Sequence, residues 1–124
     1  MRVQIKRLNH VQISISPGEE DKARDFYGKL LGLKEIPKPE ILRPSGGLWF
    51  EVADIQLHIG VEVGQSPSKR HPAFEVENLQ QIRAYLSENG VRTKDEHSLS
   101  GVDRFSFLDP FGNRIEFMER TDVR

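Results

Sequence analysis

Residues 107–116 read FLDPFGNRIE, in which a short segment of Asp, Pro, Gly and Asn separates two alternating runs of side chains. Alternation of apolar and polar residues is typical of a β-strand that buries one face. Asp, Pro, Gly and Asn are favoured in tight connections. The segment therefore predicts two strands, 103–108 and 114–119, joined by a turn at 109–113.

The residues before this pair predict three further elements. A strand at 71–76 precedes a helix that ends at Asn89-Gly90, and a short strand follows at 91–94. Helical spacing places four residues on one side of that helix: Leu79, Ile82, Tyr85 and Leu86. The second half of the chain is therefore expected to run strand, helix and three strands.

The first half of the chain predicts the same order of elements. Its strands are expected at 8–16, 33–37, 48–52 and 55–61, and its helix follows the first of them. The apolar side of this helix is expected to consist of Ala23, Phe26, Tyr27, Leu30 and Leu31.

The repeated order predicts an α+β fold in which a βαβββ module is used twice. We expect one domain over residues 1–124, made of modules 8–62 and 70–119. The modules should form curved mixed sheets with the helices on the outer face, because a sheet packed by helices on one side leaves its other side free.

Composition narrows the candidate partners and ligands. A net charge of -1 provides no general attraction for nucleic acid or for an anionic membrane surface. The chain has no cysteine, so any metal must be held by nitrogen and oxygen. The first residues alternate charged and apolar side chains and lack the apolar run of a secretory signal, so we expect a cytoplasmic protein.

Four candidate metal ligands occupy matching places in the two modules. His10 and His71 lie in the opening strands, and His58 and Glu116 lie 48 and 45 residues later in the closing strands. Strand alternation places all four off the main apolar face, where a curved sheet would gather them in a cup. Imidazole and carboxylate together suit Zn, Fe, Ni, Mn or Co better than Ca.

A simpler explanation exists for each of these residues taken alone, because a histidine on the polar face of a strand is usually solvated. The matched positions in a duplicated unit favour ligation over that explanation. His97 lies in a polar loop outside the repeat, so we expect it at the surface. Trp49 and Glu51 could line the cup, although a half-buried Trp beside a solvated Glu is the simpler expectation.

Three segments resemble a known family: 8–11, 23–33 and 107–116. Over residues 8–119 the chain is similar to the vicinal-oxygen-chelate superfamily, which contains glyoxalase I, fosfomycin-resistance proteins, extradiol dioxygenases and bleomycin-binding proteins. The resemblance implies a glyoxalase-like fold with metal ligands at His10, His71 and Glu116. It implies a further ligand at His58, where glyoxalase I carries Glu.

The resemblance also implies a homodimer with two sites. In each site His10 and His58 of one chain would face His71 and Glu116 of the other. The match to fosfomycin-resistance proteins is poorer, since Gln12 and Ser106 stand where those proteins usually place Thr and Tyr.

Two functions follow from this resemblance. The first is a divalent-metal-dependent lyase, isomerase or dioxygenase that acts on a small oxygen-chelating substrate, with Glu116 as a metal ligand or a catalytic base. The second is a small-molecule or antibiotic-binding resistance protein without catalysis. The ligand set favours the enzyme.

Overall fold

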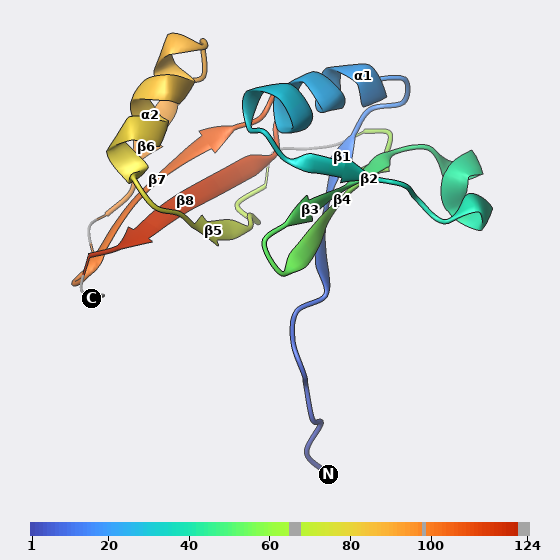
Figure 1. The fold of residues 1–124 in the computed structure, drawn as a ribbon, viewed down its shortest axis with the longest axis horizontal. Coiled ribbons are helices and arrows are strands. Elements are labelled where there is room, and N and C mark those ends of the chain that lie inside the picture. The colour runs from blue at the N-terminus through green and yellow to red at the C-terminus, as the bar shows by residue number, and fades with distance from the viewer. Residues whose placement is uncertain (65–67, 98, 122–124) are drawn as a thin grey trace. The chain divides into compact units, whose positions relative to one another are not determined.

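The structure is a computed structural model that describes residues 1–64, 68–97 and 99–121. The chain divides into two compact units, unit 1 (Met1–Gln65) and unit 2 (Ser66–Arg124). Each unit contains its own four-stranded sheet and a helical segment that packs against it (Figure 1). The described part of the chain contains no helix that is both long and apolar enough to span a bilayer.

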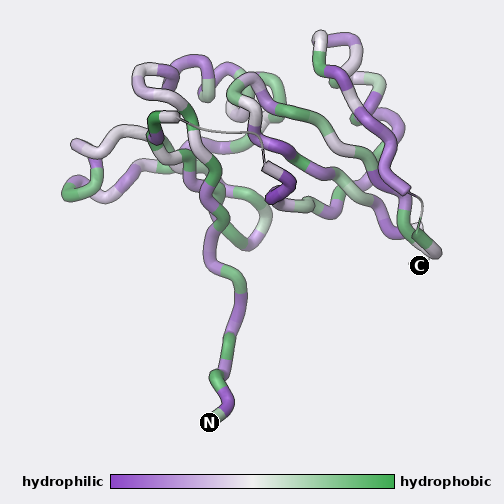
Figure 2. Tube along the Cα trace, turned by 180° about the vertical axis from the view of Figure 1, so that it is seen from behind, coloured by the Kyte–Doolittle hydropathy of each residue, from purple (hydrophilic) through white to green (hydrophobic). Residues whose placement is uncertain are grey.

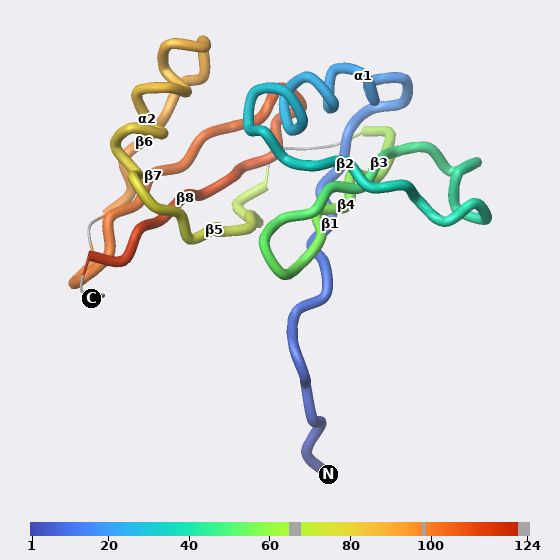
Figure 3. Tube along the Cα trace, viewed as in Figure 1, coloured from blue at the N-terminus to red at the C-terminus, as the bar shows by residue number. Residues whose placement is uncertain are grey.

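The sheet of unit 1 is mixed. Its strands have the spatial order β1-β4-β3-β2, so the first strand lies beside the last (Figure 3). β1 pairs with β4 in parallel, and the other pairs are antiparallel. The elements of unit 1 are β1 (His10–Ile15), α1 (Glu20–Ala23), η1 (Arg24–Leu30), β2 (Lys34–Ile36), η2 (Glu40–Ser45), β3 (Leu48–Val52) and β4 (Ile55–Val61).

The core of unit 1 lies between its helix and one face of its sheet. Tyr27 is 1% exposed, and its ring lies 6.1 Å from the ring of Phe50 in β3. The helix differs from the expected α-helix, because η1 is a π-helix in which Leu31 N donates to Phe26 O at 3.0 Å. A π turn contains more residues than an α turn. The predicted apolar side therefore holds as far as Tyr27, and Leu30 is only half-buried.

Unit 2 repeats this arrangement. Its sheet has the order β5-β8-β7-β6, in which β5 and β8 are parallel and the other pairs antiparallel. The elements are β5 (Ala73–Glu75), α2 (Leu79–Glu88), β6 (Thr93–Asp95), β7 (Val102–Leu108) and β8 (Arg114–Arg120). The predicted α+β class with two mixed sheets is therefore confirmed.

The core of unit 2 is a cluster of phenylalanines under α2. The ring of Phe117 in β8 lies 5.9 Å from Phe105 and 5.1 Å from Phe107, both in β7. Leu79 and Leu86 of α2 are buried, as expected from the apolar side of that helix. Tyr85 was expected on the same side but is 44% exposed.

The turn of residues 109–113 is held by its own first side chain. Asp109 Oδ1 accepts hydrogen bonds from Phe111 N at 2.9 Å and Asn113 N at 2.8 Å. Its other carboxylate oxygen, Oδ2, accepts from Asn113 Nδ2 at 2.9 Å. The carboxylate therefore replaces backbone partners inside the turn, which accounts for Asp at its start and Asn at its end.

Four strands are shorter than predicted, namely β1, β2, β5 and β6, and the difference matters most at β5. The strand predicted at 71–76 begins at Ala73, so the prediction that His71 lies in it is wrong. Pro72 has no N–H to donate to a strand ladder. Its carbonyl still accepts from Glu116 N at 3.1 Å, which keeps His71 beside β8.

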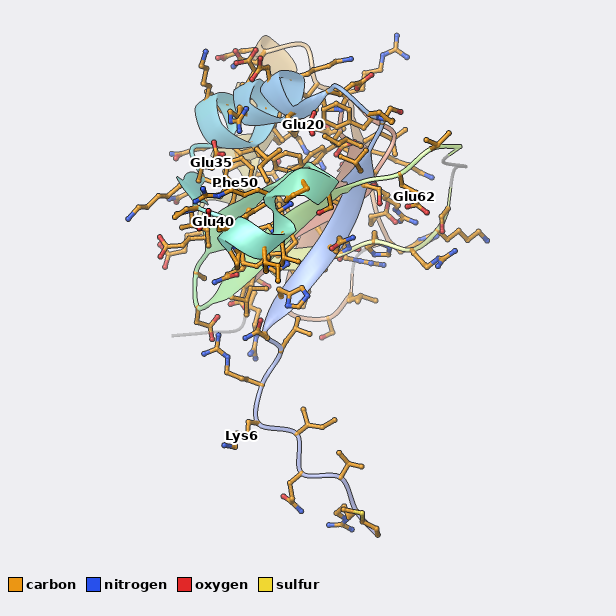
Figure 4. The ribbon with its side chains drawn as sticks, turned by 90° about the vertical axis from the view of Figure 1, so that its right-hand side faces the viewer. Lys6, Glu20, Glu35, Glu40, Phe50 and Glu62 are labelled. Atoms are coloured by element: carbon orange, nitrogen blue, oxygen red, sulfur yellow. The ribbon has the colours of Figure 1, made fainter. Side chains whose placement is uncertain are left out.

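The residues before β1 are exposed, in contrast to the buried cores of the two units. Val3 and Ile5 are 71% and 82% exposed, and the segment alternates hydrophobic and hydrophilic residues (Figure 2). Lys6 marks this segment in Figure 4. It is tied to the sheet at Arg7, whose guanidinium donates to Asp54 O in the β3–β4 turn.

Candidate functional site

The first candidate pair, His10 and His58, meets within unit 1. The two imidazole rings stack with their centroids 4.0 Å apart and 16° between their planes. Trp49 of β3 also stacks on His58, at 3.8 Å and 2°. Because β1 and β3 flank β4 on opposite sides, His10 and Trp49 cover opposite faces of the His58 ring.

The environment of His58 keeps its imidazole neutral. The side chain is almost completely buried, with 7% of the residue exposed. Burial, followed by the nearby charges of His10 and Lys38, lowers the pKa of His58 from 6.5 to about 4. A neutral imidazole is the form that binds a metal ion.

Hydrogen bonds orient both rings. His10 Nδ1 lies 2.9 Å from Asn9 Oδ1, and His58 Nε2 lies 2.9 Å from Gln56 Oε1. An amide oxygen can only accept, so these ring nitrogens donate and the lone pairs of the neutral rings are on His10 Nε2 and His58 Nδ1. Metal-binding histidines are commonly oriented by such a bond from the other ring nitrogen.

The second candidate pair, His71 and Glu116, meets within unit 2. His71 Nε2 lies 3.1 Å from Glu116 Oε1, and Glu116 is 4% exposed. His71 Nδ1 lies 2.8 Å from Lys69 O, a carbonyl that can only accept. His71 therefore donates to Lys69 through Nδ1 and presents Nε2 to the Glu116 carboxylate.

Arg104 contacts the same carboxylate and was missed by the sequence analysis. Its Nη1 donates to Glu116 Oε1 at 3.3 Å, and its Nε donates to His97 O at 3.0 Å. Ser106 lies directly opposite Glu116, and strand alternation places Arg104 on the same face of β7 as Ser106. That alternation was the signal in the sequence that could have identified Arg104.

A second carboxylate lies on the same side of the unit 2 sheet. Ser106 Oγ donates to Glu96 Oε2 at 2.6 Å, and Arg114 Nη2 lies 3.1 Å from Glu96 Oε1. The hydrogen bond from Ser106, supported by the charge of Arg114, lowers the pKa of Glu96 below its ordinary value. Glu96 is therefore held as a carboxylate by its own partners.

The four predicted ligands thus form two pairs, one in each unit. In residues 1–64, 68–97 and 99–121, no three His, Cys, Asp or Glu side chains are grouped closely enough to hold a metal ion. His97 is exposed, as expected, and takes part through its backbone carbonyl. Glu51 is also exposed, whereas Trp49 belongs to the His58 stack.

A cavity of about 480 Å³ adjoins the histidine pair of unit 1. The sheet contributes His10, His58, Trp49 and Gln12 to its lining, and the segment that leads from β2 through η2 contributes Lys38, Leu42 and Ser45. Figure 4 views unit 1 from the η2 side, with Glu40 labelled at the start of η2. The volume lies within the range of small-molecule sites in proteins.

Comparison with known proteins identifies the family of this chain. The model of the Glyoxalase/Bleomycin resistance protein/Dioxygenase superfamily matches residues 7–117. The Arabidopsis thaliana protein "Glyoxylase I 4" is 31% identical over 121 residues, which cover 88% of this chain and 68% of that protein.

Solved structures show the same fold. A putative glyoxalase family protein from Bacillus anthracis has a TM-score of 0.90 and 46% identity, with 97% of this chain and 99% of that chain covered. TnmS3, an antibiotic binding protein from Streptomyces sp. CB03234, has a TM-score of 0.75 and 21% identity, with 96% and 99% covered. The second similarity concerns the fold alone. Since the family model spans nearly the whole sequence, the chain belongs to the Glyoxalase/Bleomycin resistance protein/Dioxygenase superfamily.

Proposed function

We propose that this protein is a divalent-metal-dependent lyase, isomerase or dioxygenase whose small substrate binds the metal through adjacent oxygens. The observation that supports this most strongly is the presence of a histidine-containing donor pair at the corresponding place in each unit. Members of the superfamily commonly use divalent metals, bind small molecules and form dimers.

The proposed metal ligands are His10 and His58 of one protomer with His71 and Glu116 of the other. A homodimer would then carry two such sites. Three imidazoles and one carboxylate suit Zn, Fe, Ni, Mn or Co. We further propose that residues 1–124 form one domain made of two modules, 8–62 and 70–119.

The protonation of the two pairs fits metal binding. His58 is already neutral, and in the neutral form of His10 the ring nitrogen that does not bond to Asn9 would carry the lone pair. In unit 2 His71 Nε2 and Glu116 Oε1 face each other at 3.1 Å, so one metal ion could contact both atoms. A metal ion binds imidazole and carboxylate in their unprotonated forms, so its binding should release any proton that these groups hold.

When bound, the metal would polarise the substrate oxygens as a Lewis acid. Glu116 would act as a ligand or would accept a proton from the substrate, because it is the carboxylate of the set. Arg104 would orient that carboxylate through the Oε1 contact at 3.3 Å. The cavity beside His10 and His58 would hold the remainder of the substrate away from water.

The first test is the metal content of the untagged protein, measured by elemental analysis after separate loading with Zn, Fe, Ni, Mn and Co. We expect about one metal ion per chain in the native protein, and none in the His10→Ala/Glu116→Ala double variant. His97→Ala is the matched control, since it removes the fourth histidine and should retain the metal. Metal retention by the double variant would exclude the proposed ligand set.

A second test asks whether metal binding depends on the Glu116 carboxylate and releases protons. Metal titration by calorimetry, in buffers of different ionisation enthalpy, reports the protons released per metal ion bound. Glu116→Gln should bind the metal more weakly than the native protein and release no more protons, because its amide is not a carboxylate and does not titrate. Equal metal affinity in the two proteins would contradict the role of Glu116 as a ligand, while circular dichroism checks that the variant remains folded.

A ligand-binding protein without catalysis is the second candidate function. The cavity in unit 1 and the fold shared with an antibiotic binding protein favour it. A metal-stripped protein that still binds a small aromatic compound tightly would support this alternative. A strict metal requirement for binding would exclude it.

A further inference from the structure

The cavity of unit 1 contains one side chain with a permanent charge. Among the described residues that line it, Lys38 is the cation, and none is a carboxylate. The other polar groups of the wall include the neutral imidazole of His58 and the amide of Gln12. The charged side chain of the lining is therefore a cation, while the Glu20 carboxylate outside the lining accepts from Gly47 N at 3.0 Å.

The contacts of Lys38 leave that charge without an ionic partner in the described part of the chain. Its ammonium donates to Gly46 O and lies 3.4 Å from Ser45 Oγ, and both acceptors are uncharged. By contrast, Arg24 pairs with Glu35 at 2.9 Å, and Lys29 pairs with Asp25 at 3.1 Å. Removing a charge from water is unfavourable unless an opposite charge compensates for it, and Lys38 is half-buried.

The charge of Lys38 acts on the part of the cavity where chemistry is proposed. It contributes to the lowered pKa of His58, after burial and the charge of His10. The wall beside it also includes apolar groups, among them Leu42 of η2 and the indole of Trp49. A ligand with an anionic group and a small apolar part would match both features.

We propose that the cavity of unit 1 binds a small organic anion whose carboxylate or phosphate oxygens pair with the Lys38 ammonium. The apolar part of this anion lies against Leu42 and Trp49. The inference rests on the proposed function in one respect, because it names this anion as the substrate class of the metal site. The binding of the anion itself needs no metal.

The chain provides its own reporter for this binding. Trp49 is the single tryptophan of the sequence, and it lines the cavity. Its fluorescence can be followed while metal-stripped protein is titrated with lactate, benzoate and mandelate, and in parallel with the corresponding neutral amides. Each acid and its amide have nearly the same shape, so the ratio of their dissociation constants isolates the charge.

We expect the native protein to bind at least one acid on the order of tenfold more tightly than its amide. Lys38→Met should abolish this preference, and Lys38→Arg should retain it. Lys34→Met is the matched control, because Lys34 lies on β2 of the same unit and does not line the cavity. No preference in the native protein, or an unchanged preference in Lys38→Met, would overturn the proposal.

Lys38 also holds Gly46, so its loss could disturb η2 rather than the ligand. A purely structural role would weaken acids and amides equally in Lys38→Met, and that result would overturn the proposal. Metal content measured on the same samples separates the two proposals. An acid preference without metal binding would contradict the proposed enzyme, whereas metal binding without an acid preference would contradict only the anion site.

Discussion

The stability of the protein should depend on pH through His58. The folded protein holds this imidazole neutral with a pKa of about 4, whereas an unfolded chain gives it a pKa near 6.5. Unfolded His58 therefore binds a proton more readily than native His58. Its contribution to stability is complete above about pH 6.5 and is lost as the pH falls toward about 4.

The two pKa values set the size of the effect. Each unit of difference corresponds to about 1.4 kcal/mol, so protonation of His58 should remove about 3 kcal/mol of stability by about pH 4. Between about pH 7.5 and pH 5 the loss should be about 2 kcal/mol. That loss is a substantial fraction of the free energy of unfolding of a small domain.

Urea unfolding of metal-stripped protein at a series of pH values measures this loss. Carboxylates also titrate in this range, so the informative quantity is the difference in unfolding free energy between the native protein and His58→Gln. That difference should shrink by about 2 kcal/mol between about pH 7.5 and pH 5. A difference that is the same at both pH values would refute the reasoning. His10→Gln should reduce the effect, since His10 helps to lower the pKa of His58.

Urea unfolding also checks three structural predictions. Gly47→Ala should lower the free energy of unfolding by about 2 to 5 kcal/mol. Gly47 has a φ of +83°, and a Cβ there would lie 2.1 Å from Ile59 O. Gly64→Ala is the control, since its φ is +77° but its Cβ would meet no other part of the described chain within 4 Å, so an equal loss in both would contradict the steric argument. Leu86→Ala should lower the free energy of unfolding by about 2 to 5 kcal/mol, because Leu86 is 0% exposed. A decrease of less than about 1 kcal/mol would be inconsistent with a packed core. Glu119→Gln should lower the free energy of unfolding by about 1 kcal/mol, because the Glu119 carboxylate accepts hydrogen bonds from two backbone N–H groups at the start of α2. An unchanged free energy of unfolding would show that this cap is dispensable.

Much of the fold could be predicted because its signals are local. The strands predicted at 48–52 and 55–61 have those bounds in the structure, and alternation identified both of them. The end of α2 followed from Asn89-Gly90, where Gly90 adopts a φ of +80°. The π-helix η1 could not be predicted, because the same apolar residues suit an α-helix until packing selects the wider turn.

The candidate site was predictable in residue type and only partly in geometry. Side-chain alternation showed that His58 and Glu116 leave the apolar face of their strands. It did not show that both side chains are buried, because their burial depends on neighbouring strands. His10 and Trp49 stack on His58, and Arg104 contacts Glu116. The metal-ligand role of the four residues remains a prediction.

The sequence by itself determined the order of elements, the positions of the turns and the donor atoms available, since these depend on residues close together in the chain. Tertiary structure decided which donors meet and in which protonation state. The parallel pairing of β1 with β4 brings His10 onto His58 across 48 residues, and the resulting desolvation lowers the pKa of His58. Desolvation and charge act through space, so they exist only once distant segments have packed together.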